Sequence, residues 1–329
     1  MQGRHPLQTS DALGAAAVQL GPQAVAFAVI LNKRYAMPYG KIAAVLRERF
    51  GLTVTRGGLV QAVHRAARQA APTYDALCAM VRGSPVVTVD ETSWRVDADV
   101  WWAWVYVTAA ATVYAIQPGR GLAQAAHVIG LDYPGVLQRD GWQSYRCFTA
   151  AAHQTCLAHL LRRCRVLLLD YPGQPFVAAV KDVLQAALAT RAASHAGTIS
   201  AHGLAVARGH YVERLGRLLA RTPSRRLRVR RFHQHLSVEF EAIFSFLFDP
   251  TLDATTWRAE HALRPLVVTR TMCGGAIARD GAPRHSTSSP ASCAPRTSAA
   301  SMRPRSSPRC SPRQRESSRH TCGPRVAIH

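Results

Sequence analysis

The stretch Pro85–Val96, PVVTVDETSWRV, places an apolar strand pattern directly before two acids. Its first residues are mostly β-branched and apolar, which favours a short buried strand. Asp90 and Glu91 follow that strand at once, in a chain with only 19 acidic residues among 329. An acid at a strand end either caps the next turn or acts as a catalytic or metal-binding residue at the edge of the sheet. The stretch therefore predicts a strand and a candidate site together.

The following residues keep the strand pattern and then change to a helix. Val100–Thr108 (VWWAWVYVT) and Thr112–Gln117 (TVYAIQ) predict two more strands joined by a turn. A helix is predicted over Gly121–Gly130, and the next strand, PGVLQRDGW, ends in a second acid, Asp140. Three strands, a helix and a further strand open a ribonuclease-H-like α/β layout. We therefore predict a mixed sheet of this kind, with a helical insertion after it and an all-α helix-turn-helix region before it.

Asp90, Asp140 and a third acid, Glu260, form the candidate catalytic set. Glu260 lies in TTWRAEHALRPLVV, which is predicted to be helical. Two like charges 4 Å apart repel by about 4 kcal/mol at an effective dielectric near 20, so three converging carboxylates need protons or divalent cations. Mg²⁺ prefers oxygen ligands, and carboxylates that hold two ions suit phosphodiester chemistry. The alternative is that each acid is structural, as acids before turns commonly are.

The N-terminal region predicts DNA binding. YGKIAAVLRERF and RGGLVQAVHRAARQAA are helical patterns separated by the break GLTVT, as in a helix-turn-helix. The residues expected on or near its groove-facing side are Arg56, Gln61, His64 and Arg65. The alternative is an ordinary helical bundle whose solvent-exposed face carries basic residues.

Net charge supports a polyanionic partner. Lys and Arg number 41, a formal net charge of +22, which favours nucleic acid first and an anionic membrane surface second. The N-terminus lacks a signal-peptide pattern, and no stretch is a convincing membrane span. Eight cysteines without a C-x-x-C pair do not form a disulfide framework. We expect a reduced, cytoplasmic protein that does not enter membranes.

Three weaker candidates surround the acids. Cys156-x-x-His159 is half of a zinc site, for which Cys147, His153 and Cys164 are conceivable partners, although packing or positioning is the alternative role. Trp142 can stack on a base or belong to the core. Arg264 can contact phosphate or pair with Glu260 four residues earlier.

Composition divides the chain into five regions. We assign 1–83 to the helical DNA-binding region, 84–165 to the first part of the catalytic domain, 166–248 to the helical insertion, 249–275 to the helix of the third acid, and 276–329 to a tail. The tail is rich in Ser, Pro and Arg, with ten Arg against two acids, and lacks apolar periodicity. We expect it to be disordered.

Four blocks of sequence resemble the successive motifs of the insertion-sequence-66 family of transposases. They are VVTVDETSWRV, GVLQRDGWQSY, HQTCLAHLLRR and WRAEHALRPLVVTR, in the family's order. The resemblance implies a ribonuclease-H-like domain and an Asp-Asp-Glu triad, which maps onto Asp90, Asp140 and Glu260. It also implies Mg²⁺, or Mn²⁺ as a substitute, DNA cleavage and strand transfer. Cys156 and His159 match the family's Cys-x-x-His.

The resemblance extends to partners and location. It implies double-stranded DNA (transposon ends and target), homo-oligomerisation on DNA, possible accessory proteins of the same element, and a bacterial cytoplasm in which the protein associates with the nucleoid.

The chain departs from the family pattern at both ends. We expect it to lack the family's N-terminal extension, a cysteine-rich, zinc-finger-like segment with a coiled-coil region, and after VVTRTMCGG the expected helical continuation is replaced by the Ser/Pro/Arg-rich tail. Given suitable codons, HSTSSP read one base later would give Thr-Gln-Gln-Val-Leu, which resembles the family's continuation, so we hypothesise a frameshift close to Gly275 that impairs activity. A non-catalytic DNA-binding protein occupying transposon ends is the main alternative, and a nuclease acting on RNA is a third.

Overall fold

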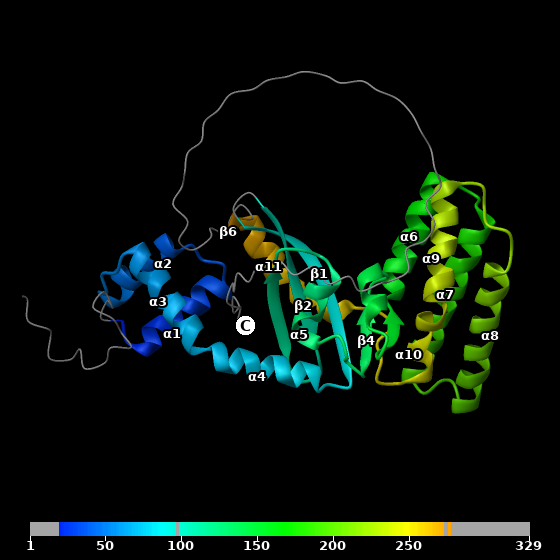
Figure 1. Ribbon diagram of the computed structural model, residues 1–329, viewed down its shortest axis with the longest axis horizontal. Helices are drawn as coiled ribbons and strands as arrows, with labels where there is room; N and C mark the ends of the chain where they lie inside the picture. The colour runs from blue at the N-terminus through cyan, green and yellow to red at the C-terminus, as the bar shows by residue number, and fades with distance from the viewer. Residues whose placement is uncertain (1–19, 97–98, 273–275, 278–329) are drawn as a thin grey trace, which may run out of the picture.

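A central sheet separates two groups of helices along an elongated molecule (Figure 1). The computed structural model describes residues 20–96, 99–272 and 276–277. Helices α1 to α3 lie at one end, and the bundle containing α6 to α9 lies at the other. No helix in these described ranges is long and apolar enough to cross a membrane.

The sheet is mixed, as predicted. Its main strands are β1 (Val86–Val96), β2 (Asp99–Val107), β3 (Thr112–Gln117), β4 (Val136–Arg139) and β5 (Ala152–Thr155), in the order β3-β2-β1-β4-β5. β1, β2 and β3 pair antiparallel, whereas β4 is parallel to both β1 and β5. The predicted order of three strands, a helix and another strand is confirmed. The sequence prediction missed β5, since four residues are too few to show a strand period.

β1 is longer than predicted. Its pairing with β2 runs from Thr88 opposite Val107 to Val96 opposite Asp99, whereas its pairing with β4 stops at Thr88 opposite Gln138. The prediction that Asp90 ends its strand is therefore wrong. Asp90 lies inside β1, just past the residues that pair with β4, because β2 supplies backbone partners to the far end of the strand.

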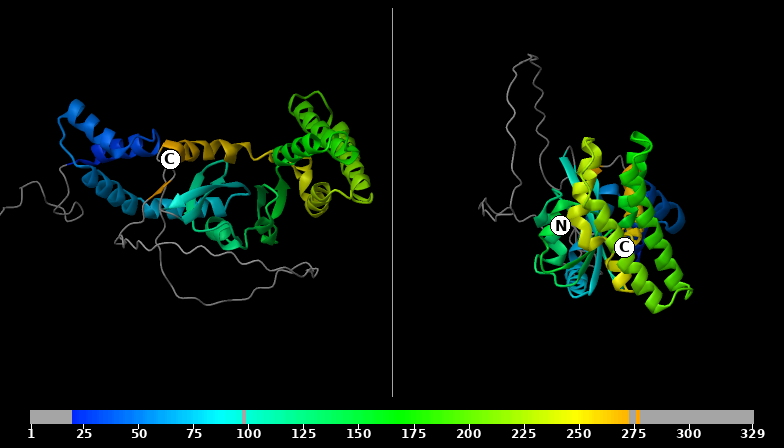
Figure 2. Two further views of the ribbon diagram at one scale, coloured as in Figure 1. Left: turned by 90° about the horizontal axis from the view of Figure 1, so that it is seen from above. Right: turned by 90° about the vertical axis from the view of Figure 1, so that its right-hand side faces the viewer.

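Helices cover both faces of the sheet. α4 (Ala71–Arg82) and α5 (Leu122–Ile129) pack on the face that carries Val87 and Val89. α11 (Trp257–Met272) packs on the opposite face through Ala259, Leu263 and Leu266, against β1 and β2 residues that include Trp94 and Val105 (Figure 2). Because side chains alternate along a strand, Glu91 faces the α4–α5 side and Asp90 faces the α11 side.

The helical insertion is a bundle with its own core. It contains α6 (Leu157–Asp170), α7 (Pro175–His195), α8 (Ala201–Leu219), α9 (Leu227–Ile243) and the short α10 (Ser245–Phe248). Leu157, Leu160, Cys164 and Leu167 lie on one face of α6 and pack into this core. α6 therefore runs across the predicted boundary at 165/166, because its apolar stripe is continuous. The 3-10 helix η2 (Gln143–Cys147) precedes β5.

The N-terminal helices follow the predicted pattern. They are α1 (Pro22–Lys33), α2 (Tyr39–Phe50) and α3 (Arg56–Gln69), with a buried core between them. Gly51 ends α2 with φ 66°, in the left-handed region that glycine adopts without penalty. The Thr55 hydroxyl accepts a hydrogen bond from the Gly58 amide at 3.0 Å and so caps α3.

The predicted tail lies almost wholly outside the described residues. Its first two residues, Ala276 and Ile277, form β6, which pairs parallel with Arg95 and Val96 of β1. These two residues therefore differ from the prediction of disorder, because the end of β1 offers unpaired backbone groups.

Candidate active site

Three elements carry the predicted acids toward one side of the sheet. Asp90 lies in β1, Asp140 follows β4, and Glu260 lies in the first turn of α11. Parallel pairing of β1 and β4 places Asp140 next to the part of β1 that holds Asp90. Packing of α11 on that face of the sheet adds Glu260 from a segment distant in sequence.

His159, in the first turn of α6, lies beside Glu260. Its Nε2 lies 3.9 Å from Glu260 Oε1. The pKa of His159 is raised to about 9, first by its interaction with the Cys156 side chain and further by the carboxylates of Asp90 and Asp140. Its Nδ1 is buried without a hydrogen-bond partner among the described residues. His159 therefore carries a positive charge among the acids at neutral pH.

Cys156 holds the start of the helix that carries Glu260. The Cys156 Sγ accepts a hydrogen bond from the Thr256 amide at 3.3 Å, one residue before α11 begins. Burial opposes ionisation of this thiol, yet His159 and Thr256 together lower its pKa. The Leu157 amide also donates to the Ala254 carbonyl at 3.0 Å. The N-terminus of α6 thus fixes the segment leading into α11.

The environment of Asp90 disfavours an isolated charge. Burial raises its pKa to about 7, and the nearby carboxylates of Glu91 and Asp140 add to the shift, against the favourable charge of His159. Its Oδ1 accepts from the Glu91 amide at 2.9 Å. A buried carboxylate with acidic neighbours is stabilised by any added cation.

Within the described ranges, no three Asp, Glu, His or Cys side chains lie close enough together to hold one metal ion. The acids share His159 as a neighbour without forming a closed cluster. The predicted zinc partners are also dispersed: His153 Nε2 bonds the Phe148 carbonyl at 3.1 Å, and Cys164 is buried in the core of the bundle, where burial raises its pKa to about 12.

Asp140 is oriented by a tryptophan and an arginine. Its Oδ1 accepts from the Trp142 amide at 2.8 Å, and its Oδ2 lies 3.5 Å from Arg120 Nη2. The Trp142 ring lies against the Arg120 guanidinium, 4.2 Å from ring centroid to carbon. One face of Trp142 is therefore occupied by Arg120 rather than open for a base.

Glu91 is a buried counter-charge. Its side chain is fully buried, and it bonds Arg120 Nε at 2.5 Å and the Tyr145 hydroxyl. Burial raises the pKa of Glu91, and Asp140 adds to this, while Tyr145 and Arg120 lower it. The sequence prediction missed Arg120; the Pro-Gly-Arg-Gly turn at 118–121, between a strand and a helix, was the available signal.

A second buried carboxylate joins the bundle to the sheet. Glu239 of α9 bonds Arg139 of β4, Arg146 at 2.7 Å and the Thr155 hydroxyl at 2.6 Å. Although burial opposes ionisation, these partners lower the pKa of Glu239. Local sequence gave no sign of this network, because its members are about 100 residues apart.

A basic face extends from the acids along α6 and α9. Arg162 Nη2 lies 3.6 Å from Glu260 Oε1. A shallow groove of about 350 Å³ between these helices is lined by Arg162, Arg163, Val166, Leu167, Arg228 and Arg231. We call this groove the α6–α9 basic groove. It begins beside Glu260, and its arginines come from two packed helices.

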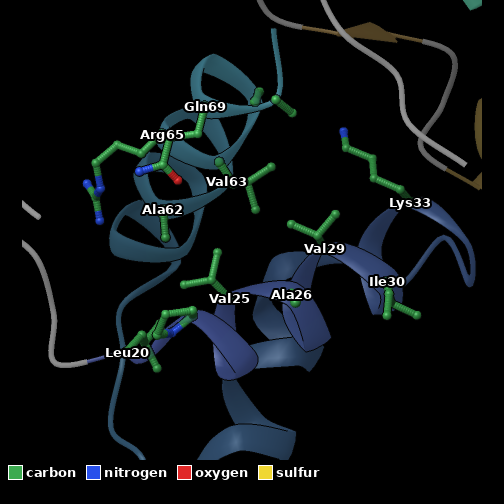
Figure 3. A pocket seen from close by; sticks show the side chains of 14 residues that line it. Leu20, Val25, Ala26, Val29, Ile30, Lys33, Ala62, Val63, Arg65 and Gln69 are labelled. Atoms are coloured by element: carbon green, nitrogen blue, oxygen red, sulfur yellow. The ribbon is translucent and has the colours of Figure 1, made fainter. Parts of the chain in front are cut away.

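The predicted DNA-binding residues of the N-terminal region lie on α3. Arg56 and Gln61 are exposed, and His64 and Arg65 are half-buried. The Arg56 side chain lies against Gly40 of α2. Arg65 lines an apolar groove of about 430 Å³ between α1 and α3, which also includes Val25 and Val63 and contains none of the acids (Figure 3).

Arg264 is exposed on α11, where it lines a shallow depression with Arg34 and Tyr35. Among the ion pairs of the described residues, Glu260 pairs with Arg162 and His159 rather than with Arg264.

Comparison with known proteins assigns the chain to a class. The family model described as "Transposase IS66 family" matches residues 17–284, which include all three acids. The protein is thus of the transposase class. Within that class, it belongs to the IS66 family.

Two other comparisons add little. No curated protein matches the chain significantly. A solved structure of the HTLV-2 integrase catalytic core domain in complex with magnesium, in its dimeric form, is 18% identical and covers 28% of this chain and 78% of its own. Its TM-score of 0.18 is too low to define the fold.

Proposed function

We propose that this transposase cleaves DNA and transfers strands at a metal-dependent site formed by Asp90, Asp140 and Glu260. The observation that carries the proposal is that β1, the end of β4 and α11 carry the three acids toward one side of the sheet, where His159 lies 3.9 Å from Glu260 and has a pKa raised in part by the carboxylates of Asp90 and Asp140. We also infer a ribonuclease-H-like domain. The strand order β3-β2-β1-β4-β5 supports it, with β1 to β3 antiparallel and β4 and β5 parallel.

The three acids would hold Mg²⁺, or Mn²⁺ in its place. All three are oxygen donors, and the pKa of Asp90 is raised first by burial and then by the carboxylates of Glu91 and Asp140, so a divalent cation would stabilise its ionised form. When bound, such ions activate water or a DNA 3′ hydroxyl and stabilise the leaving oxygen in phosphodiester cleavage.

Cys156 and His159 serve as positioning residues in this proposal. The Cys156 thiol fixes the Thr256 amide at the start of α11, and His159 contacts Glu260 in its first turn. Together they hold the third acid against the sheet. The long segment between Asp140 and Glu260 makes such a connection necessary, because the two acids are 120 residues apart in sequence.

DNA is the partner that the charge distribution favours. The net charge is +22, and the α6–α9 basic groove begins at the acids, where a phosphodiester backbone would run. We assign α2, the Gly51 turn and α3 to a helix-turn-helix whose exposed side carries Arg56 and Gln61, with His64 and Arg65 beside them. Arg264 and Trp142 are further DNA contacts in this proposal.

The remaining assignments follow from the family. We infer double-stranded transposon ends and target as partners, oligomerisation on DNA, assistance by other proteins of the element, and a nucleoid-associated location in a bacterial cytoplasm. The family match runs to residue 284, nine residues past Gly275, and the Ser/Pro/Arg-rich sequence continues beyond it; the frameshift near Gly275 remains our proposal. The nucleotide sequence tests that point directly: an in-frame ancestor with the same tail would contradict it.

The proposal is tested with a supercoiled plasmid that carries the coding region's own flanking genomic DNA. With Mg²⁺, the wild-type protein should nick and join this DNA, and Asp140→Asn should lower the rate on the order of 10³-fold or more. Asp182→Asn, which changes an exposed acid of α7, is the matched control and should leave the rate unchanged.

A second candidate is a non-catalytic protein that occupies transposon ends. The absence of a closed three-ligand cluster among the described residues favours it. Under this alternative, wild-type and Asp140→Asn proteins would bind the flanking DNA equally and neither would cut it.

A further inference from the structure

We propose that Arg120 is a positioning residue for the active site, which holds Asp140 in place by sharing its guanidinium with the buried Glu91. This inference rests on the proposed function, because Asp140 is one of the proposed metal-binding acids. The role of Arg120 explains why two acids are adjacent in β1. Asp90 faces the proposed metal site, and Glu91 binds the arginine that orients Asp140.

The loop that carries Arg120 is pinned at three points. The Trp104 indole donates to the Gly119 carbonyl at 3.3 Å, and the Trp142 indole donates to the Arg120 carbonyl at 3.1 Å. The Gly121 amide donates to the Gln124 side chain at 3.1 Å. The backbone that presents Arg120 is therefore held from both sides of the residue, as a positioning role requires.

Two tryptophans fix the plane of the guanidinium. Its carbon lies 4.8 Å from the ring centroid of Trp102 and 4.2 Å from that of Trp142. Stacking on aromatic rings suits the flat, delocalised guanidinium better than an ammonium group. With the plane fixed, the directions of its N–H groups are fixed as well.

Those N–H groups reach two carboxylates. Nε bonds Glu91 Oε1 at 2.5 Å, and Nη2 lies 3.5 Å from Asp140 Oδ2. Glu91 is fully buried, and both of its oxygens are engaged: Oε1 by Arg120 and Oε2 by the Tyr145 hydroxyl. The contact between Arg120 and Asp140 is longer than that between Arg120 and Glu91. In this inference Arg120 therefore orients the Asp140 carboxylate but leaves it able to bind a metal ion.

Trp142 contacts both Asp140 and Arg120. The Trp142 amide donates to Asp140 Oδ1 at 2.8 Å, its indole nitrogen donates to the Arg120 carbonyl, and its ring stacks on the guanidinium. Asp140, Trp142 and Arg120 thus form one unit, which Glu91 and Tyr145 anchor to the buried face of the sheet. Residues that orient metal ligands typically change metal affinity by about 10–100-fold when mutated.

The test measures Mn²⁺ binding to the full chain without DNA, by electron paramagnetic resonance of the free ion. We expect Arg120→Gln to weaken the Asp140-dependent Mn²⁺ affinity about tenfold or more, and Arg120→Lys to weaken it less, because lysine keeps the charge but loses the planar fork. Arg258→Gln is the matched control, since Arg258 also pairs with an acid, Asp253, and lies over a ring, Trp257. It should bind Mn²⁺ as the wild type does.

The double variant Glu91→Gln/Arg120→Gln separates positioning from stability. It removes both charges of the pair and so leaves no unpaired buried carboxylate, and we therefore expect it to unfold less readily than Arg120→Gln. Its Mn²⁺ affinity should remain low, because nothing then orients Asp140. Recovery of wild-type affinity in the double variant would overturn the inference, as would wild-type affinity in folded Arg120→Gln.

Two further outcomes would separate a failure of this inference from a failure of the proposed metal site. If Arg120→Gln kept its Mn²⁺ affinity but reduced the salt dependence of DNA binding, Arg120 would be a phosphate contact and not a positioning residue. If Asp140→Asn bound Mn²⁺ as tightly as the wild type, the proposed metal site itself would fail, and this inference with it.

Discussion

His159 Nε2 lies 3.9 Å from Glu260 Oε1, and this contact joins the first turn of α6 to the first turn of α11. The two helices are separated in sequence by the rest of the bundle, yet the contact puts a cationic ring beside the third acid. Asp90 and Asp140 act on the same ring, since both help to raise its pKa to about 9. His159 therefore lies beside Glu260, and the carboxylates of Asp90 and Asp140 favour its charged form, so a divalent cation held by the acids would compete with this charge.

Metal should locate near the three acids even though they form no closed cluster in the described residues. Fe²⁺ bound in place of Mg²⁺, with ascorbate and peroxide, cuts the backbone close to where it sits. We expect cuts near Asp90, Asp140 and Glu260 that excess Mg²⁺ suppresses, and Asp182→Asn, at an exposed position on α7, should leave their positions unchanged. Scattered cuts, or cuts insensitive to Mg²⁺, would show that the acids do not share a metal site.

Asp90→Asn should stabilise the metal-free protein above pH 7. Burial and the neighbouring carboxylates raise the pKa of folded Asp90 from 3.8 to about 7, opposed by His159. Ionisation therefore penalises the folded state increasingly as pH rises from 4 to 7, and the asparagine variant lacks this penalty. The gain in unfolding free energy at pH 8 should be on the order of 1–3 kcal/mol and should shrink as pH falls toward 4.

The measurement for Asp90→Asn is urea unfolding at pH 5 and pH 8 in a chelating buffer. Asp182→Asn, at an exposed position on α7, should change stability by less than about 0.5 kcal/mol at both pH values. Equal stability of Asp90→Asn and the wild type at pH 8 would contradict the expected ionisation of Asp90.

Glu239→Gln should weaken the connection between the bundle and the sheet. Arg139 is buried at 3% side-chain exposure, and it would lose its charged partner. Removing one member of a buried pair costs about 3–5 kcal/mol, measurable as a lower urea midpoint. The control Glu213→Gln breaks the exposed pair with Arg217 on α8 and should cost at most about 0.5 kcal/mol. A small loss for both variants would mean that the Glu239 network contributes little to docking.

Neutralising the α6–α9 basic groove should reduce the salt dependence of DNA binding. For a mixed-sequence duplex, each phosphate contact contributes about 0.9 to the slope of log affinity against log salt, so Arg228→Gln/Arg231→Gln should lower the slope by up to about 2. The slope is measured by fluorescence anisotropy over a range of salt concentrations. Arg217→Gln/Arg221→Gln, which removes two exposed cations at the end of α8, is the control. Equal slopes for both double variants would exclude the groove as the DNA path.

Periodicity alone was enough to predict the order of three strands, a helix and a fourth strand, because side-chain alternation and helical spacing are local properties. VWWAWVYVT and TVYAIQ became β2 and β3, whereas the short β5 was missed. The motif blocks also identified the family, which the match over residues 17–284 confirms. The triad itself stays a prediction.

Tertiary structure alone decided how long β1 is and what Glu91 does. Asp90 seemed to end a strand because the apolar run stops at Val89, but pairing with β2 carries the strand on to Val96. Glu91 was set aside as a neighbour of Asp90, and its partners Arg120 and Tyr145 come from 29 and 54 residues away. Glu239 is likewise explained only by Arg139, 100 residues earlier. Buried charges depend on partners that the fold brings together, so their roles follow from packing and not from local sequence.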